Sequence, residues 1–160
     1  KNKNKIHWNT IYKVFIKLHN NDIFKISYID LLKKYLTKSS NKKLKIIITD
    51  TSFIPNKNGK EKIGYNKFYN KKKGTKISII TDSKGTPLNV ECYSGNRNDT
   101  MILENHLKKD NLINRNILEI NRKYFIADKG YDSYKLCEQL CELKYEVLIP
   151  QRKIIKDIKK

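Results

Sequence analysis

Two aspartates, Asp50 and Asp128, have the residue type and the setting for metal chemistry. Each follows a run of apolar residues, at 46–48 before the first and 125–127 before the second. A carboxylate in such a place costs several kcal/mol unless a partner compensates its charge. Two carboxylates close together repel each other, and Mg²⁺ or Mn²⁺ relieves that repulsion. A cation held between them could activate a water molecule and stabilise the leaving oxygen of a phosphodiester.

The alternative is structural: each aspartate begins a turn or pairs with a lysine such as Lys129, and spacing alone leaves both interpretations open. Two other aspartates have local explanations. Asp82 begins the segment Asp-Ser-Lys-Gly, which is typical of a type I turn. Asp99 or the next residue, Thr100, is a good helix N-cap. We therefore take Asp50 and Asp128 as the candidate catalytic and metal-binding pair.

The elements that must position this pair alternate between strands and helices. Apolar residues spaced three and four apart between Ile6 and Thr37 predict two short helices, broken near residues 20–22. A polar linker at 37–43 and a basic loop at 55–73 are expected from composition. Strands are predicted at 44–50, 76–81, 88–93, 123–128 and 145–149, and helices are predicted after Asp99 and after Ser133.

This order predicts an α/β fold. We expect a mixed sheet, in the order strand, strand, strand, helix, strand, helix, strand, with helices on its faces and short N-terminal helices before it. The strand at 44–50 is apolar enough to be central and buried on both faces. If it pairs with 76–81 on one side, a right-handed crossover brings 123–128 to the other. Asp50 and Asp128 then project side by side at the carboxyl ends of adjacent parallel strands, where such sheets bind ligands.

The chain of 160 residues has 35 lysines and arginines against 16 acidic residues, a net charge of +19. This excess favours a polyanionic partner, because each phosphate neutralised releases counterions. AT-rich coding, which accumulates Lys, Asn and Ile, also accounts for part of it. No stretch reaches the roughly 18 apolar residues of a membrane span, so we expect no membrane partner and a soluble intracellular protein, cytoplasmic, or nuclear in a eukaryotic host. Three cysteines without zinc-type spacing indicate neither a metal site nor a disulfide framework.

Lysines concentrate between residues 57 and 76, interleaved with Tyr65, Phe68 and Tyr69. Because lysine contacts phosphates rather than reading bases, we expect largely sequence-independent binding of double-stranded DNA. A merely solvated loop is the alternative. The candidate DNA-binding residues, including three outside this segment, are Lys57, Lys60, Lys62, Lys67, Lys71, Lys72, Lys73, Lys76, Arg97, Lys129 and Arg152.

Several short motifs of the sequence resemble motifs of the DDE transposases of bacterial insertion sequences, in the grouping of families four and five. The most specific motif is Ala-Asp128-Lys-Gly-Tyr-Asp-Ser. The others are Ile-Thr-Asp50-Thr-Ser, Lys73-Gly-Thr-Lys-Ile, Ile-Thr-Asp82-Ser-Lys-Gly-Thr-Pro-Leu, Ser94-Gly-Asn-Arg-Asn-Asp and Ile149-Pro-Gln-Arg152. The resemblance spans nearly the whole chain in order, and it implies an RNase H-like catalytic domain at 44–160 after an N-terminal helical segment and linker at 1–43.

The resemblance implies that Asp50 and Asp128 are the first two members of an Asp-Asp-Glu triad. Such a triad binds two Mg²⁺ or Mn²⁺ ions for cleavage and transfer of transposon ends. The family's Glu lies on a helix beyond the Pro-x-Arg motif, and no residue after Arg152 stands in a matching context. We therefore expect a domain that is incomplete at its C-terminus, with a homodimer or a second chain supplying the missing Glu.

Two other functions remain open at this stage. The first is a catalytically inactive, transposase-derived DNA-binding protein, in which the basic segment persists and the triad does not. The second is an RNase H-like nuclease that acts on RNA or on hybrids, since the sequence does not visibly encode the choice of substrate.

Overall fold

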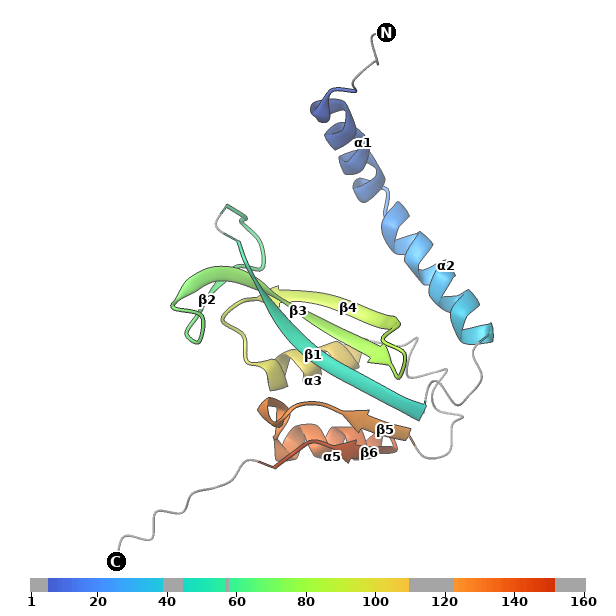
Figure 1. Cartoon of the computed structure of the whole chain (residues 1–160), viewed down its shortest axis with the longest axis vertical. Helices are drawn as coiled ribbons and strands as arrows, with labels where there is room; N and C mark the ends of the chain where they lie inside the picture. The colour runs from blue at the N-terminus through green and yellow to red at the C-terminus, as the bar shows by residue number, and fades with distance from the viewer. Residues whose placement is uncertain (1–5, 39–44, 57, 110–122, 152–160) are drawn as a thin grey trace, which may run out of the picture. The chain divides into compact units, whose positions relative to one another are not determined.

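The computed structural model describes residues 6–38, 45–56, 58–109 and 123–151. The chain divides into two compact units, Lys1–Ser39 and Ser40–Lys160, and each is described by itself (Figure 1). The predicted linker at 37–43 falls largely outside the described residues, as do two candidate DNA-binding residues, Lys57 and Arg152.

The N-terminal unit consists of two helices, α1 (Trp8–Asn20) and α2 (Ile23–Lys38). They are separated at Asp22, whose φ of 55° places it in the left-handed region and ends the regular helix. The rings of Phe15 and Phe24, one from each helix, lie 5.5 Å apart between centroids. The two predicted helices and the break between them are therefore confirmed.

The described residues of the second unit form a mixed sheet of six strands: β1 (Ile46–Pro55), β2 (Gly64–Asn66), β3 (Lys72–Asp82), β4 (Pro87–Ser94), β5 (Lys123–Ile126) and β6 (Tyr145–Leu148). β1 is central: it pairs antiparallel with β3 on one side and parallel with β5 on the other, and β6 extends the sheet parallel to β5. The outer side of β3 pairs first with β2 and then with β4. Figure 1 shows β5 and β6 beside the first half of β1, while its second half continues with β3 toward β2.

The connection between β3 and β4 is the predicted turn. Asp82 is fully buried, and its Oδ1 accepts hydrogen bonds from the backbone N–H groups of Lys84 and Thr86, both at 2.9 Å. Gly85 adopts φ +77°, which residues with a side chain rarely adopt. Asp82 is thus committed to the turn, as the sequence predicted.

The basic segment at 55–73 is not the irregular loop that its composition suggested. It contains β2, which forms a hairpin with the start of β3. Asn70 and Lys71 both have positive φ, at 50° and 53°, and the N–H of Lys72 donates to the carbonyl of Tyr69 at 2.9 Å. These features define a type I′ turn, whose twist matches that of a hairpin. The lysines here are therefore carried by a defined hairpin, which is termed the basic hairpin below (residues 64–73).

Helices α3 (Asp99–Lys109) and α5 (Tyr134–Glu142) cover the same face of the sheet. On α3, Nδ1 of His106 lies 2.9 Å from Oγ of Ser78 on β3, and Lys135 of α5 forms an ion pair with Glu104 of α3 at 3.0 Å. The core lies between these helices and the sheet. Its fully buried side chains include Ile47, Ile80, Ile102, Leu103, Phe125, Leu136 and Leu140.

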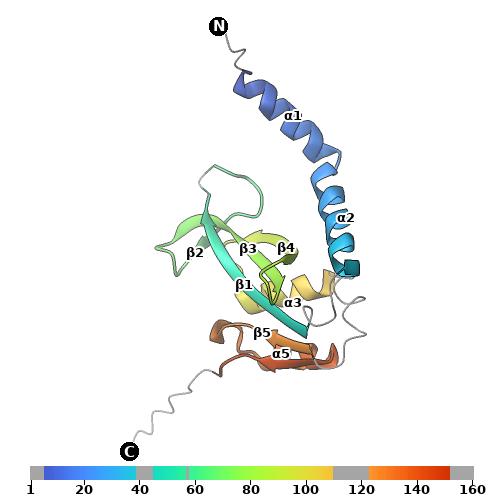
Figure 2. The same ribbon diagram turned by 45° about the vertical axis from the view of Figure 1, so that its right-hand side comes forward.

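The prediction that β1 is buried on both faces was wrong. Its residues alternate: Ile47 and Thr49 are buried beneath the helices, whereas Ile48 is 37% and Ile54 is 47% exposed. The apolar run at 46–48 therefore belongs to a central strand. Among the described residues, only one face of this strand is covered. Figure 2 shows the same arrangement turned by 45°, with α3 behind β1 and α5 beside β5. The order β4-β3-β1-β5-β6, with β3 antiparallel, is the RNase H-like arrangement that the sequence predicted.

Candidate active site

Asp50 lies within β1, and Asp128 lies two residues beyond the end of β5, the parallel strand beside it. The last paired residues of β1 and β5 are Ile48 and Ile126, and each aspartate lies two residues beyond its member of this pair. Because side chains alternate along a strand, Asp50 continues the face of β1 that carries Ile48. Both aspartates are exposed to solvent. The predicted parallel pairing of these two strands is confirmed, but β1 continues to Pro55, so Asp50 lies within its strand and not at the predicted carboxyl end; the side-by-side arrangement of the two carboxylates stays a prediction.

Each carboxylate is oriented by a backbone N–H close to it in sequence. Oδ1 of Asp50 accepts from the N–H of Thr51 at 2.8 Å. Oδ1 of Asp128 accepts from the N–H of Gly130 at 2.6 Å, which makes Asp128 the N-cap of the short 3₁₀ helix η2 (Lys129–Tyr131). A Cβ at position 130 would lie 2.7 Å from this same Oδ1, so glycine is what permits the close approach. The structural alternative holds in part for Asp128, which does begin a turn.

A part-buried hydrogen bond connects the middle of β1 to η2, the turn that follows β5. The hydroxyl of Tyr131 lies 2.6 Å from Oγ1 of Thr51, and the tyrosine side chain is only 2% exposed. Burial raises the pKa of Tyr131 well above its usual range; the hydrogen bond with Thr51 acts in the opposite direction, and the charges of Asp99, Asp50 and Asp128 raise it further. The charges of three carboxylates therefore raise the pKa of this one phenol. Sequence reasoning did not single out Thr51 or Tyr131, although both lie within the motifs that carry the resemblance.

Asp99 does not have the role that the sequence suggested. Oδ1 of Asn98 accepts from the N–H of Thr100 at 3.0 Å, so Asn98 provides the side-chain cap of α3. Oδ1 of Asp99 instead lies 2.7 Å from Nζ of Lys76, which also donates to the carbonyl of Arg97 at 2.8 Å. At the start of α5, Ser133 occupies the N-cap position without a side-chain hydrogen bond. The local patterns located both helix starts but assigned the cap of α3 to the wrong residue.

The chemistry of the donors at Asp50 and Asp128 suits a hard divalent cation. Mg²⁺ is commonly bound through one or two carboxylates, with water and substrate phosphate completing its octahedral shell. Within the described ranges, no cluster of three or more His, Cys, Asp or Glu residues could hold a metal ion. The two aspartates thus fit part of a site for such a cation.

Among the described candidate DNA-binding residues, Lys76 is held by contacts within the protein, whereas the others are exposed to solvent. Lys76 is 8% exposed and is held by Asp99 and the carbonyl of Arg97. Lys73 is exposed, and its Nζ lies 5.2 Å from the centroid of the Tyr65 ring. The other exposed candidates are Lys60, Lys62, Lys67, Lys71, Lys72, Arg97 and Lys129.

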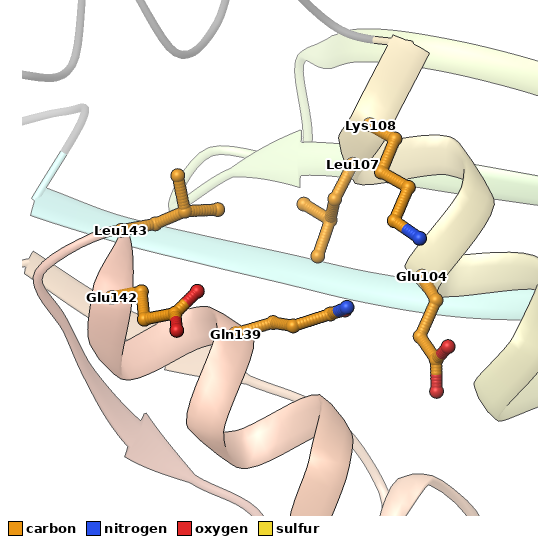
Figure 3. A pocket seen from close by; sticks show the side chains of 6 residues that line it. All are labelled: Glu104, Leu107, Lys108, Gln139, Glu142 and Leu143. Carbon is orange, nitrogen blue, oxygen red and sulfur yellow. The ribbon is translucent and has the colours of Figure 1, made fainter.

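A pocket of about 240 Å³ lies between α3 and α5 (Figure 3). Its lining includes Glu104, Leu107, Gln139 and Glu142, and none of the candidate site residues contributes to it. Since α5 leads into the start of β6, its C-terminal half lies at the end of the sheet opposite the aspartates. This pocket is therefore separate from the candidate active site.

The strand order and directions define an RNase H-like fold. The sequence model described as "Transposase DDE domain" matches residues 41–160, three quarters of the chain. The chain therefore belongs to the family of transposase DDE domains. A search of curated proteins found no match.

Solved structures with a similar chain trace are also transposases. A synaptic complex of the piggyBac transposase with hairpin DNA has a TM-score of 0.49 and 16% identity, covering 71% of this chain and 24% of that one. The catalytic domain of the Mos1 mariner transposase has a TM-score of 0.45 and 18% identity, covering 78% of this chain and 57% of that one. The Mos1 paired-end complex with Mn has a TM-score of 0.46 and 22% identity, covering 77% and 40%. The chain thus spans about a quarter to about half of these proteins.

Across the described part of the chain, no helix is both long enough and apolar enough to span a membrane.

Proposed function

We propose that this chain is the catalytic domain of an insertion-sequence transposase, which cleaves and transfers DNA strands with divalent metal ions. The observation that carries the proposal is the register of β1 and β5, in which Asp50 and Asp128 each lie two residues beyond the Ile48–Ile126 pair. In this proposal residues 44–160 form the catalytic domain, and residues 1–43 form a separate N-terminal helical segment.

Asp50 and Asp128 would hold the metal ions through their exposed carboxylates. When bound, two Mg²⁺ or Mn²⁺ ions supply activation of the attacking oxygen and stabilisation of the leaving oxygen. The chain's own groups orient these carboxylates: the N–H groups of Thr51 and Gly130 each hold one oxygen, leaving the other available. A third carboxylate, from a second chain or a second copy of this one, would complete the triad.

Double-stranded DNA would approach along the basic hairpin. β2 and the start of β3 extend from the second half of β1, which begins at Asp50, so the lysines lie at the same end of the sheet as the carboxylates. Lys67, Lys71, Lys72 and Lys73 are all exposed there. Their ammonium groups suit phosphate contacts that position the duplex without reading its sequence.

The catalytic proposal is tested with labelled duplex DNA and Mn²⁺. We expect slow, metal-dependent cleavage that Asp50→Asn and Asp128→Asn each reduce at least 100-fold, because the amide keeps the shape but loses the charge. Asp30→Asn, the same change at an exposed position of α2, is the matched control. Cleavage unchanged in Asp128→Asn would rule out this site, and preference for RNA or hybrid substrates would favour the nuclease alternative.

A second candidate function is a transposase-derived protein that binds DNA without cleaving it. It is favoured by the absence, within the described ranges, of a metal cluster with three or more side-chain ligands. Wild-type protein that binds DNA but shows no Mn²⁺-dependent cleavage, alone or mixed with a chain carrying the missing Glu, would support this candidate over the first.

Both candidates require DNA binding that depends on salt. The logarithm of the binding constant falls with the logarithm of salt concentration with a slope of about −0.9 per phosphate neutralised. Replacing Lys71, Lys72 and Lys73 with Gln should therefore make that slope shallower by about 2 to 3. Lys84→Gln, at the opposite end of β3, is the control and should leave it unchanged. A wild-type affinity that is insensitive to salt would sink both candidates.

A further inference from the structure

A cleft of about 450 Å³ lies next to the candidate active site. One wall comes from the β2–β3 hairpin, at residues 65–68, and the opposite wall from the connection between β4 and α3, at residues 95–99. Gly130, whose N–H holds the carboxylate of Asp128, also lines it. The cleft volume falls within the range of about 300–1,000 Å³ that is typical of sites for small organic groups.

The cleft wall carries aromatic, amide and cationic groups together. Phe68 is 93% and Tyr65 is 58% exposed, so both present ring surface to solvent. The backbone holds the position of Phe68, because its N–H donates to Oδ1 of the buried Asn66 at 2.9 Å. On the opposite wall, Asn96 and Arg97 are exposed.

This combination matches the parts of one nucleotide. An aromatic ring stacks on a base of any identity, an amide hydrogen-bonds to the edge of a base, and a cation contacts the phosphate. In a duplex, neighbouring base pairs cover both faces of every internal base, so only an unpaired base can stack on a protein ring. A cleft of about 450 Å³ has room for one such nucleotide.

We propose that this cleft binds an unpaired nucleotide of a DNA strand adjacent to the bond that is cleaved. The proposal rests on the function proposed above, since it places the strand next to Asp128. Phe68 stacks on the base, the amide of Asn96 faces the base edge, and Lys67 and Arg97 contact the flanking phosphates. The basic hairpin would then bind the duplex, while the cleft binds a strand that has left it.

The test measures binding alone, so that it stands apart from catalysis. The Asp128→Asn protein is mixed, in EDTA, with a blunt duplex or with the same duplex carrying a three-nucleotide single-stranded extension, and affinity is measured by fluorescence anisotropy. We expect the extension to bind more tightly than the blunt end. Phe68→Ala should weaken binding of the extension about 5- to 150-fold, the range for loss of one stacked base, and should leave the blunt duplex unaffected.

Phe68→Tyr keeps an aromatic face and should retain the affinity for the extension. Lys84→Ala, in the β3–β4 turn, is the control and should change neither substrate. Phe68 is almost fully exposed, so its replacement does not threaten the fold. Equal affinity for both substrates, or an equal loss on both in Phe68→Ala, would overturn the proposal. An RNA extension that binds more tightly than the DNA extension would overturn its assignment to DNA.

Because no cleavage is needed, the two proposals can fail separately. A protein that cleaves DNA but shows no preference for the extension loses only the cleft. A protein that prefers the extension but never cleaves with Mn²⁺ retains the cleft as a single-strand site and loses the catalytic function.

Discussion

The hydroxyl of Tyr131 lies 2.6 Å from Oγ1 of Thr51, and this part-buried contact joins the middle of β1 to η2, the 3₁₀ turn that follows β5. Thr51 directly follows Asp50. Tyr131 ends the 3₁₀ turn that Asp128 begins, and its N–H donates to the carbonyl of Asp128 at 3.1 Å. The contact therefore fixes the spacing between Asp50 and Asp128 without involving either carboxylate.

Removing this contact should weaken metal binding more than it weakens the fold. We expect Tyr131→Phe to lower the free energy of unfolding by about 1 kcal/mol, the usual contribution of one neutral hydrogen bond. Affinity for Mn²⁺, followed by electron paramagnetic resonance of the free ion, should fall about 10-fold, as for other groups that orient metal ligands. Thr51→Val should have the same effects, and the double variant should be little worse than either single one.

Tyr134→Phe is the matched control, because Tyr134 is 83% exposed and the chemical change is identical. Thr51→Ser keeps the hydroxyl and should retain affinity for Mn²⁺. Strictly additive losses in Thr51→Val and Tyr131→Phe would show that the two hydroxyls do not act together.

The raised pKa of Tyr131 predicts how stability depends on pH. The folded state favours the protonated phenol, so its contribution is fully present below the unfolded pKa of about 10 and is lost as pH rises through the higher folded pKa. The difference in unfolding free energy between wild type and Tyr131→Phe should therefore be constant between about pH 6 and pH 9 and should narrow above about pH 10. Urea denaturation across this range measures it, and a difference that widens above pH 10 would contradict the assignment.

Gly130→Ala should displace the carboxylate of Asp128 at little cost to the fold. The added methyl group would lie 2.7 Å from Oδ1, and the side chain of Asp128 can rotate away because it is exposed. We expect Mn²⁺-dependent cleavage to fall about 10-fold or more, in line with losses from disturbed ligand orientation, with the melting temperature within a few degrees of wild type. Gly85→Ala, at a distant turn, is expected to show the reverse pattern: lower stability, because its φ is +77°, and unchanged affinity for Mn²⁺. Full cleavage activity in Gly130→Ala would argue against a requirement for this orientation.

The ion pair between Lys76 and Asp99 should stabilise the connection between β3 and α3. Its nitrogen–oxygen distance is 2.7 Å, and the two side chains are 10% and 40% exposed. We expect Lys76→Met and Asp99→Asn each to cost about 1–3 kcal/mol, the usual range for a hydrogen bond to a charged group. The loss of unfolding free energy in the double variant, measured by urea denaturation, should be smaller than the sum of the losses in the two single variants.

The pair between Lys135 and Glu104 provides the comparison, because the lysine there is 66% exposed. Lys135→Met should cost no more than about 1 kcal/mol, as is usual for surface pairs. If Lys76→Met lowers the free energy of unfolding no more than Lys135→Met does, Lys76 is available to bind DNA directly, as the sequence first suggested.

Local patterns in the sequence were sufficient for most elements of the fold. The helical period located α1 and α2, and the β-branched runs located β1, β3, β4, β5 and β6. The turn at Asp82 followed from its Asp-Ser-Lys-Gly pattern. These predictions succeeded because the signals depend on residues a few positions apart, which act before any tertiary contact forms.

The candidate pair was singled out in the sequence because each aspartate follows an apolar run, but the burial cost inferred from that pattern does not apply, since both side chains are exposed. The hairpin within the basic segment was missed, since its turn has Asn-Lys rather than a glycine at the two positions with positive φ. The role of Asp99 was missed because its partner, Lys76, lies 23 residues away. In each case the deciding contact was specific to the folded chain.

The sequence by itself therefore determined most of the elements and singled out Asp50 and Asp128 as the candidate pair. The tertiary structure alone decided three things: the register that pairs β1 with β5, the part-buried contact between Thr51 and Tyr131, and the cleft between the β2–β3 hairpin and the β4–α3 connection. The physical reason is the distance along the chain between the residues that interact. Periodicity and turn chemistry depend on neighbours in sequence, whereas register, burial and cleft walls depend on segments brought together only when the sheet and its helices pack.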